Sequence, residues 1–153
     1  MNKILNHFLL ILIISSHATF SFASNHYPIT RESKLNNERG KLLYTQYCAS
    51  CHQVNLSGAE DWKGYDADGH RKAPPLNGTG HTWHHSDETL HQIIKYGFAK
   101  LIKNYEGKMI GFEENLSNKE IDYILGFIKS HWNDEYYDHQ NSKSIKLFFY
   151  ILK

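Results

Sequence analysis

The stretch Cys48-Ala49-Ser50-Cys51-His52 decides the interpretation of this chain. Its pattern, C-x-x-C-H, is typical of covalent attachment of a c-type haem. Two thiols three residues apart on one helical turn can add to the two vinyl groups of a haem and form thioether bonds. The imidazole of His52 then lies where it can bind the iron. The chain has only these two cysteines, so no other thiol competes for the role.

Three other uses of this cysteine pair fit the sequence less well. A zinc site usually needs four ligands, with a second pair of Cys or His residues. A thioredoxin-like motif needs a βαβ pattern nearby, and none is visible. A disulfide is possible in an oxidising compartment, but it leaves the adjacent His52 unexplained. We therefore predict one haem c per chain, bound through Cys48 and Cys51.

Length and composition indicate one domain with an ordinary surface. The chain has 153 residues, which is enough for one domain and too few for two domains of typical size. Its hydrophobic content of 41% and aromatic content of 14% can form a core around a bulky apolar cofactor. The formal net charge of +1 gives no basic field for nucleic acid, so we expect no nucleic-acid partner.

The N-terminus is typical of a secretory signal peptide. Lys3 precedes an apolar run over residues 8–14, and Ser21-Phe22-Ala23 is a small-x-small cleavage site. Cleavage after Ala23 is the first choice and cleavage after Ala18 the second. The run is shorter than the roughly 20 apolar residues that span a bilayer. We therefore expect a signal peptide over 1–23, no membrane span in the mature chain and a periplasmic protein.

Helical periodicity and capping signals divide the rest of the chain. A polar lead-in covers residues 24–36, and a helix follows over about 37–47. Residues 53–80 have no sustained period and five glycines, which predicts a long loop wrapped around a haem edge. A helix begins after the N-cap Ser86 and ends at Gly97. Its apolar face comprises Leu90, Ile93 and Ile94.

The last clear helix begins with a capping box at Ser117 and Glu120 and ends near Trp132. Its buried stripe is Ile121, Ile124, Leu125 and Ile128, with Phe127 beside it. The C-terminal tail, residues 133–153, is polar at first and strongly apolar over 145–152. That apolar run is too short to cross a membrane, and we expect it to dock on the domain or stay mobile, with contact to a membrane surface as an alternative.

The order of several short motifs resembles the class I cytochrome c family, in its bacterial periplasmic type. The motifs are Gly40-Lys41-Leu42-Leu43-Tyr44, the C-x-x-C-H stretch, Ala73-Pro74-Pro75-Leu76, Met109-Ile110-Gly111-Phe112 and the amphipathic last helix. The resemblance covers about residues 37–132, the expected cytochrome c domain. It implies an all-α fold of cytochrome c-like helices packed around one covalently attached haem. It also implies an electron-transfer protein rather than an enzyme, working with other redox proteins, and we expect a monomer.

The resemblance also implies roles for individual residues. The Pro74 carbonyl would accept a hydrogen bond from the far nitrogen of His52 and strengthen the donation of that imidazole to iron. Leu76 would pack on the haem face, and Trp83 or a neighbouring histidine would line the haem crevice and donate a hydrogen bond to a propionate. Met109, the only methionine left after the signal peptide, would be the sixth ligand.

The resemblance further implies that the first and last helices cross. Gly40 and Tyr44 would meet Ile124 and Phe127, and Gly40 together with Gly126 would let the two backbones approach closely.

Two departures from the family pattern bear on the iron ligands. Ala73 stands where the family has glycine, and Ile110 stands where it has proline. Without the fixed φ of proline the Met109 loop is less stiff. This leaves bis-His ligation or Lys108 as alternatives to Met109. With an open or bis-His sixth position, the protein would be a gas- or peroxide-reactive enzyme, a sensor or a copper-linked module.

The histidines near Trp83 allow a further alternative, which is a second metal site. His81, His84 and His85 lie close together in sequence and could bind copper or zinc. The glycines at 78 and 80 favour a loop rather than a helix there. The competing interpretation is that these imidazoles lie along the edge of the haem crevice.

Overall fold

The chain is described here by a computed structural model that places residues 28–31 and 33–151. The predicted signal peptide lies outside the described residues. The described part is helical and contains no named strand, so the predicted all-α class is confirmed. Its helices, six α and one short 3₁₀ (η1), are α1 (Lys34–Tyr47), α2 (Ala49–His52), η1 (Thr82–His84), α3 (Asp87–Tyr96), α4 (Phe98–Leu101), α5 (Asn118–Lys129) and α6 (Asp134–Ile151).

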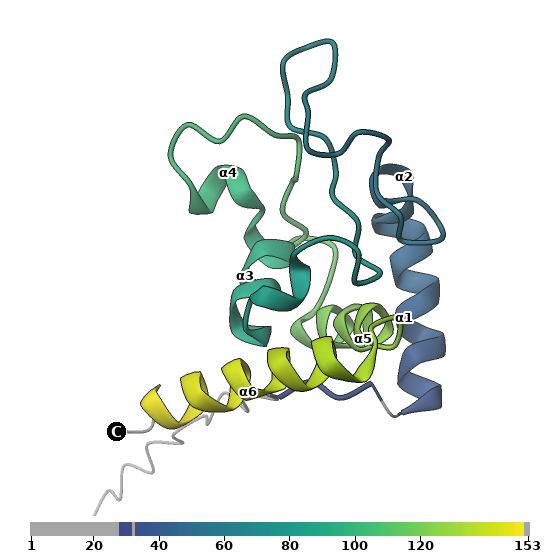
Figure 1. The fold of residues 1–153 in the computed structure, drawn as a ribbon, viewed down its shortest axis with the longest axis vertical. Coiled ribbons are helices and arrows are strands. Elements are labelled where there is room, and N and C mark those ends of the chain that lie inside the picture. The colour runs from purple at the N-terminus through teal and green to yellow at the C-terminus, as the bar shows by residue number, and fades with distance from the viewer. Residues whose placement is uncertain (1–27, 32, 152–153) are drawn as a thin grey trace, which may run out of the picture.

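Helices α1 and α5 cross, as Figure 1 shows, and Gly40 lies at the contact between them. A Cβ atom on Gly40 would overlap the Tyr123 carbonyl and come within 2.8 Å of Phe127 Cβ. The Tyr44 and Phe127 rings pack one turn further along, 5.4 Å apart. The predicted crossing through Gly40 and Tyr44 is therefore present. The close contact predicted at Gly126 involves atoms other than the α1 backbone: a Cβ atom there would lie 3.1 Å from the Thr30 carbonyl oxygen, before α1, and 3.4 Å from the Asn37 side chain on α1.

The segment before α1 is more ordered than the predicted polar lead-in. Ile29 is buried in the core, and Arg31 donates to the Trp132 carbonyl at 2.8 Å. Helix α1 begins at Lys34, three residues earlier than predicted, because the Ser33 side chain caps it by accepting from the Asn36 amide.

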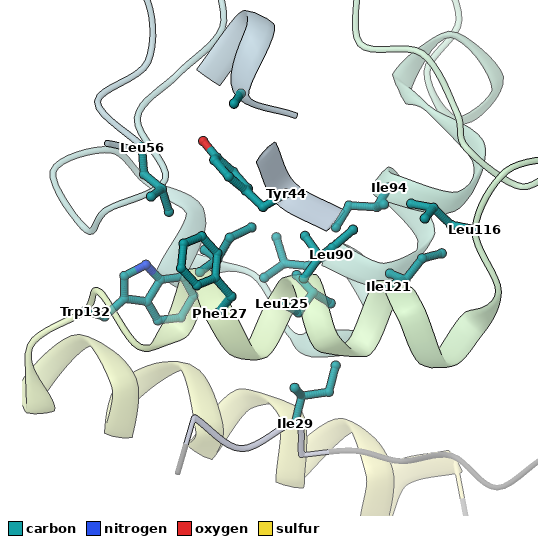
Figure 2. Close-up of a cluster of buried hydrophobic side chains, with 13 residues drawn as sticks. Ile29, Tyr44, Leu56, Leu90, Ile94, Leu116, Ile121, Leu125, Phe127 and Trp132 are labelled. Carbon is teal, nitrogen blue, oxygen red and sulfur yellow. The ribbon is translucent and has the colours of Figure 1, made fainter. Parts of the chain in front are cut away.

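The caps of α3 and α5 are those that the sequence predicts. Ser86 accepts from the Thr89 amide, and Gly97 ends α3 with a φ of 72°. The Ser117 and Glu120 side chains and amides form a reciprocal capping box. Helix α5 ends at Lys129, short of the predicted Trp132. The predicted stripe of α5 is buried in one cluster with residues of α1 and α3 (Figure 2).

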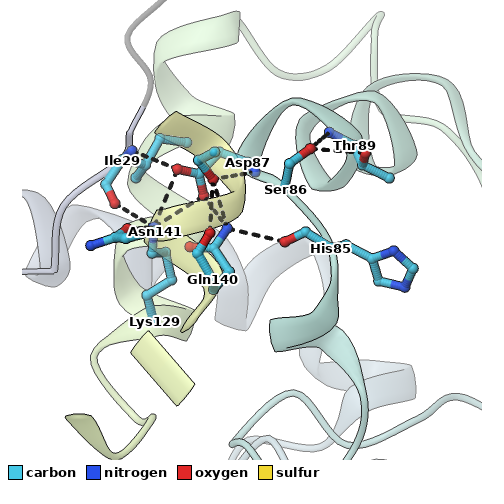
Figure 3. Close-up of polar contacts among 9 residues, drawn as sticks. Ile29, His85, Ser86, Asp87, Thr89, Lys129, Gln140 and Asn141 are labelled. Carbon is cyan, nitrogen blue, oxygen red and sulfur yellow. Dashed lines mark hydrogen bonds and ion pairs between the residues drawn. The ribbon is translucent and has the colours of Figure 1, made fainter. Parts of the chain in front are cut away.

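The predicted C-terminal tail is the long helix α6, which lies across the lower side of the molecule in Figure 1. It is held by a buried polar network (Figure 3) and by stacking of Tyr136 on Trp83 of η1. Gln140 Nε2 donates to Asp87 Oδ1 at 2.7 Å, and the Asp87 amide donates to Ser144 Oγ at 2.9 Å. The first part of the predicted tail is therefore docked on the domain, whereas Ile145 and Tyr150 of the apolar run are exposed. No helix in the described residues is long and apolar enough to cross a membrane.

Candidate functional site

The two cysteines and His52 share the single turn that follows α1. The Cys51 and His52 amides donate to the Cys48 carbonyl at 3.2 and 2.9 Å, and this closes the turn of α2. Both thiols are free, with Cys51 exposed and Cys48 half-buried. Burial, and secondarily the neighbouring Cys51, raises the pKa of the Cys48 thiol to about 12. The turn thus presents two reduced thiols three residues apart beside one imidazole.

The His52 ring is held in one tautomer. Its side chain is buried, and Nδ1 lies 2.8 Å from the Pro74 carbonyl oxygen. A carbonyl oxygen only accepts, so Nδ1 carries the proton and Nε2 keeps its lone pair. Burial lowers the pKa of His52, with the Pro74 bond opposing it, so the neutral form is favoured near pH 7. This is the hydrogen bond that the family resemblance implied, and it leaves Nε2 as a metal donor.

A tight turn over residues 53–58 follows His52. Three of its residues have positive φ: Gln53 at 66°, Leu56 at 60° and Gly58 at 71°. Gly58 donates its amide to the His52 carbonyl at 3.0 Å, which closes the turn on the histidine. Positive φ at a residue other than glycine costs roughly 1–3 kcal/mol. The turn is therefore strained and depends on contacts with the rest of the fold.

The same turn fixes the Pro74 carbonyl. Backbone hydrogen bonds flank the proline on both sides, from the Leu76 amide to Leu56 at 2.8 Å and from the Ala59 amide to Ala73 at 2.9 Å. A Cβ atom on Gly58 would lie 2.5 Å from the Pro75 nitrogen, so glycine is required for this approach. Leu76 itself is half-buried against the core cluster.

Met109 lies on a loop packed against the corner between α3 and α4. Its side chain is half-buried, and its carbonyl accepts from the Phe98 amide at 3.3 Å. The preceding residue, Lys108, binds Asp66 Oδ2 at 2.8 Å and Asp68 Oδ2 at 3.0 Å. These two ion pairs tie the Met109 loop to the 53–80 loop, which also carries Pro74. They restrain a loop in which Ile110 does not supply the fixed φ of proline.

Trp83 and its neighbouring histidines pack toward α6. The Trp83 indole stacks on Tyr136 with centroids 4.2 Å apart and on His84 at 3.7 Å, and its N–H donates to the Gly80 carbonyl at 3.2 Å. In the described part of the chain, the three predicted histidines do not bring three metal-binding atoms together. Three such atoms do meet at Asp66, Asp68 and His70, where Lys108 already binds both carboxylates.

A family model described as cytochrome C oxidase, cbb3-type, subunit III matches residues 35–128. The chain belongs to this family. The match runs from the start of α1 almost to the end of α5, so it contains every predicted haem-site residue and leaves α6 outside. Comparisons with curated proteins and with solved structures gave no significant match.

This membership makes the chain a c-type cytochrome and confirms that assignment, and such domains carry haem and transfer electrons. The residues present fit the cofactor. They offer two unpaired thiols on one turn, and a neutral imidazole whose Nδ1 is bonded and whose Nε2 is not bonded by any described protein atom. Sequence reasoning missed the strained turn and the Lys108 ion pairs, because neither leaves a local sequence signal.

Proposed function

We propose that this cytochrome is a periplasmic one-electron carrier with one haem c per chain and His52 and Met109 as axial ligands. Cys48 and Cys51 would hold the haem through thioether bonds. When bound, the haem iron supplies the redox chemistry by alternating between the ferric and ferrous states. The observation that carries the proposal is the 2.8 Å hydrogen bond between His52 Nδ1 and the Pro74 carbonyl, which leaves Nε2 as the donor.

The chain's own residues would tune and shield this centre. The Pro74 carbonyl polarises the His52 N–H and strengthens the imidazole as a donor. Leu56 and Tyr44 are fully buried beside the turn and exclude water from that side. The Met109 thioether is a soft, neutral donor that favours the ferrous state, and it raises the potential relative to two histidines. With both axial positions filled, substrate chemistry at iron is not expected.

The proposed boundaries are a signal peptide over 1–23, a lead-in over 24–36, a cytochrome c domain over 37–132 and a C-terminal segment over 133–153. In this proposal the mature protein begins at Ser24, is a monomer and exchanges electrons with other redox proteins. Intact mass of the protein purified from a periplasmic extract tests the cleavage, the attached haem and the number of haems together.

A second candidate function follows from the family description, which names an oxidase subunit. In that case the chain would transfer electrons inside a larger complex. Native mass of the protein in a mild-detergent extract separates the two candidates. The carrier migrates at the mass of one haem-loaded chain, and a subunit migrates with its partners.

The ferric absorption spectrum of the wild type and of Met109→Ala tests the proposed ligands. We expect a six-coordinate low-spin haem with a sulfur-to-iron charge-transfer band that the substitution abolishes. Ile110→Ala, at the exposed neighbouring position, is the matched control and should keep the band. A band missing from the wild type points to histidine or lysine ligation. A five-coordinate high-spin spectrum points to the gas- or peroxide-reactive alternatives.

A further inference from the structure

The turn after His52 cannot be maintained by its own backbone preferences. Gln53 has φ 66° and ψ 154°, a region that is essentially restricted to glycine. Leu56, three residues later, also has positive φ. Two residues with side chains in strained conformations persist only where neighbouring groups hold them.

Leu56 is held by burial, but Gln53 is not. The Leu56 side chain is fully buried, whereas the Gln53 side chain is exposed and adds no packing. The Gln53 carbonyl instead accepts a hydrogen bond from the Tyr44 hydroxyl at 2.7 Å. Within the described residues, this is the one side-chain hydrogen bond that reaches the turn from another element.

The Tyr44 hydroxyl is well suited to hold this position. The residue is fully buried in the α1–α5 contact, where its ring packs on Phe127, so the place of the hydroxyl is set by the packing of two helices. Burial, and secondarily Cys48, raises the pKa of the Tyr44 phenol above its ordinary value. The hydroxyl therefore stays protonated and donates.

The strained residue is directly linked to the histidine. Gln53 follows His52 by one peptide bond, and the turn closes through the Gly58 amide onto the His52 carbonyl at 3.0 Å. Relaxation of the Gln53 backbone would therefore rotate that peptide unit and move His52 relative to the Pro74 carbonyl, which is fixed separately by the 73–76 segment.

We propose that Tyr44 is a positioning residue, whose hydroxyl holds the strained turn 53–58 and thereby sets the orientation of the His52 imidazole. This inference rests on the proposed role of His52 as an iron ligand. Tyr44 would act through Gln53 and would not touch the cofactor's iron.

The test uses Tyr44→Phe, which removes the hydroxyl and keeps the ring, in the full haem-loaded ferric protein. The readouts are the hyperfine-shifted proton resonances of the axial histidine, the hydrogen-exchange rate of the Gly58 amide and the reduction potential. Tyr123→Phe, on α5 and away from the turn, is the matched control. Gln53→Gly supplies the rescue, because glycine adopts the residue-53 conformation without strain.

We expect Tyr44→Phe to shift the histidine resonances, to speed Gly58 exchange and to raise the potential, since a weaker Pro74 bond reduces donation to iron. We expect Tyr123→Phe to change none of these. In the Gln53→Gly background, Tyr44→Phe should leave the histidine resonances in place.

Unshifted resonances in Tyr44→Phe, or a shift that Gln53→Gly does not remove, would overturn the inference while the proposed function stands. If the wild type itself lacks axial-histidine resonances, the ligand assignment of the proposed function has failed, and this inference fails with it.

Discussion

Lys129 and Asp87 form an ion pair in which both side chains are fully buried, with 3.0 Å between Lys129 Nζ and Asp87 Oδ1. The pair joins four parts of the chain (Figure 3). Lys129 at the end of α5 also donates to the Ile29 carbonyl and to Asn141 Oδ1 on α6. Asp87 at the start of α3 accepts from the Ile29 amide and from Gln140 Nε2. The network thus attaches two segments outside the matched family region to the cytochrome core.

Lys129→Met is expected to lower the free energy of unfolding by about 3–5 kcal/mol. The substitution leaves the Asp87 carboxylate buried without its cation, and an uncompensated buried charge is costly. Chemical denaturation of the ferric haem-loaded protein measures the change.

Lys100→Met is the matched control for this substitution, because it breaks an exposed ion pair with Glu113. Exposed pairs are screened by water, so we expect little change in stability. If Lys129→Met were as mild as the control, the buried network would not hold α6 to the core.

Gly40→Ala is expected to destabilise the protein by about 1–3 kcal/mol through overpacking against α5. The sign of this stability change is diagnostic, because alanine in an exposed helix interior normally stabilises a protein by about 1 kcal/mol relative to glycine. Thermal unfolding of the haem-loaded protein measures it. Gly64→Ala, in a loop where the nearest atom to a new Cβ is the Asp61 carbonyl at 3.3 Å, is the control and should change stability little. A stabilised Gly40→Ala would show that the two backbones are not in contact.

Features with a local chemical cause could be predicted from the sequence. Ser86 and Ser117 start their helices because each side-chain oxygen accepts a hydrogen bond from the amide three residues later, and that spacing is visible in the sequence. Gly97 ends α3 because it adopts positive φ. The C-x-x-C-H spacing likewise places its residues on one turn without reference to the rest of the fold.

Features that depend on distant partners could not be predicted. Helix α6 lacks an apolar stripe over its first half, and its buried residues Gln140 and Ser144 form hydrogen bonds with Asp87, more than fifty residues earlier. Lys129 resembles an ordinary basic residue in a last helical turn, and only its tertiary partners explain its burial. At Gly126 the nearest backbone atom is the Thr30 carbonyl oxygen, before α1, and spacing within α5 gives no sign of that partner.

Replacing Cys48 and Cys51 together by alanine is expected to abolish covalent haem. The physical reason is that each thioether needs one of the two free thiols on the α2 turn. Haem staining after denaturing electrophoresis measures the attachment. Ser50→Ala, inside the same turn but without a thiol, is the control and should keep full staining. Stain that persists in the double variant would contradict the attachment site.

The ion pair between Lys108 and Asp66 is expected to release only at strongly acidic pH. The hydrogen bond from Lys108, and then that from the His70 amide, lowers the pKa of Asp66 from its ordinary 3.8 to about 2. A carboxyl whose pKa is lower in the folded state stabilises the fold above its unfolded pKa. That contribution is lost as pH falls from 3.8 toward 2. The Asp66 carboxyl carbon shift, followed by NMR during an acid titration, measures the midpoint.

Lys108→Met should move the Asp66 midpoint up toward the ordinary value, and Lys103→Met, at an exposed lysine of the same segment, should leave it unchanged. Because Lys108 precedes Met109, loss of the Lys108 ion pairs should also weaken the proposed bond between the Met109 sulfur and the iron. We therefore expect the sulfur-to-iron band to disappear at a higher pH in Lys108→Met than in the wild type. If the band is lost at the same pH in both proteins while the Asp66 midpoint moves, the ion pairs form but do not restrain the Met109 loop.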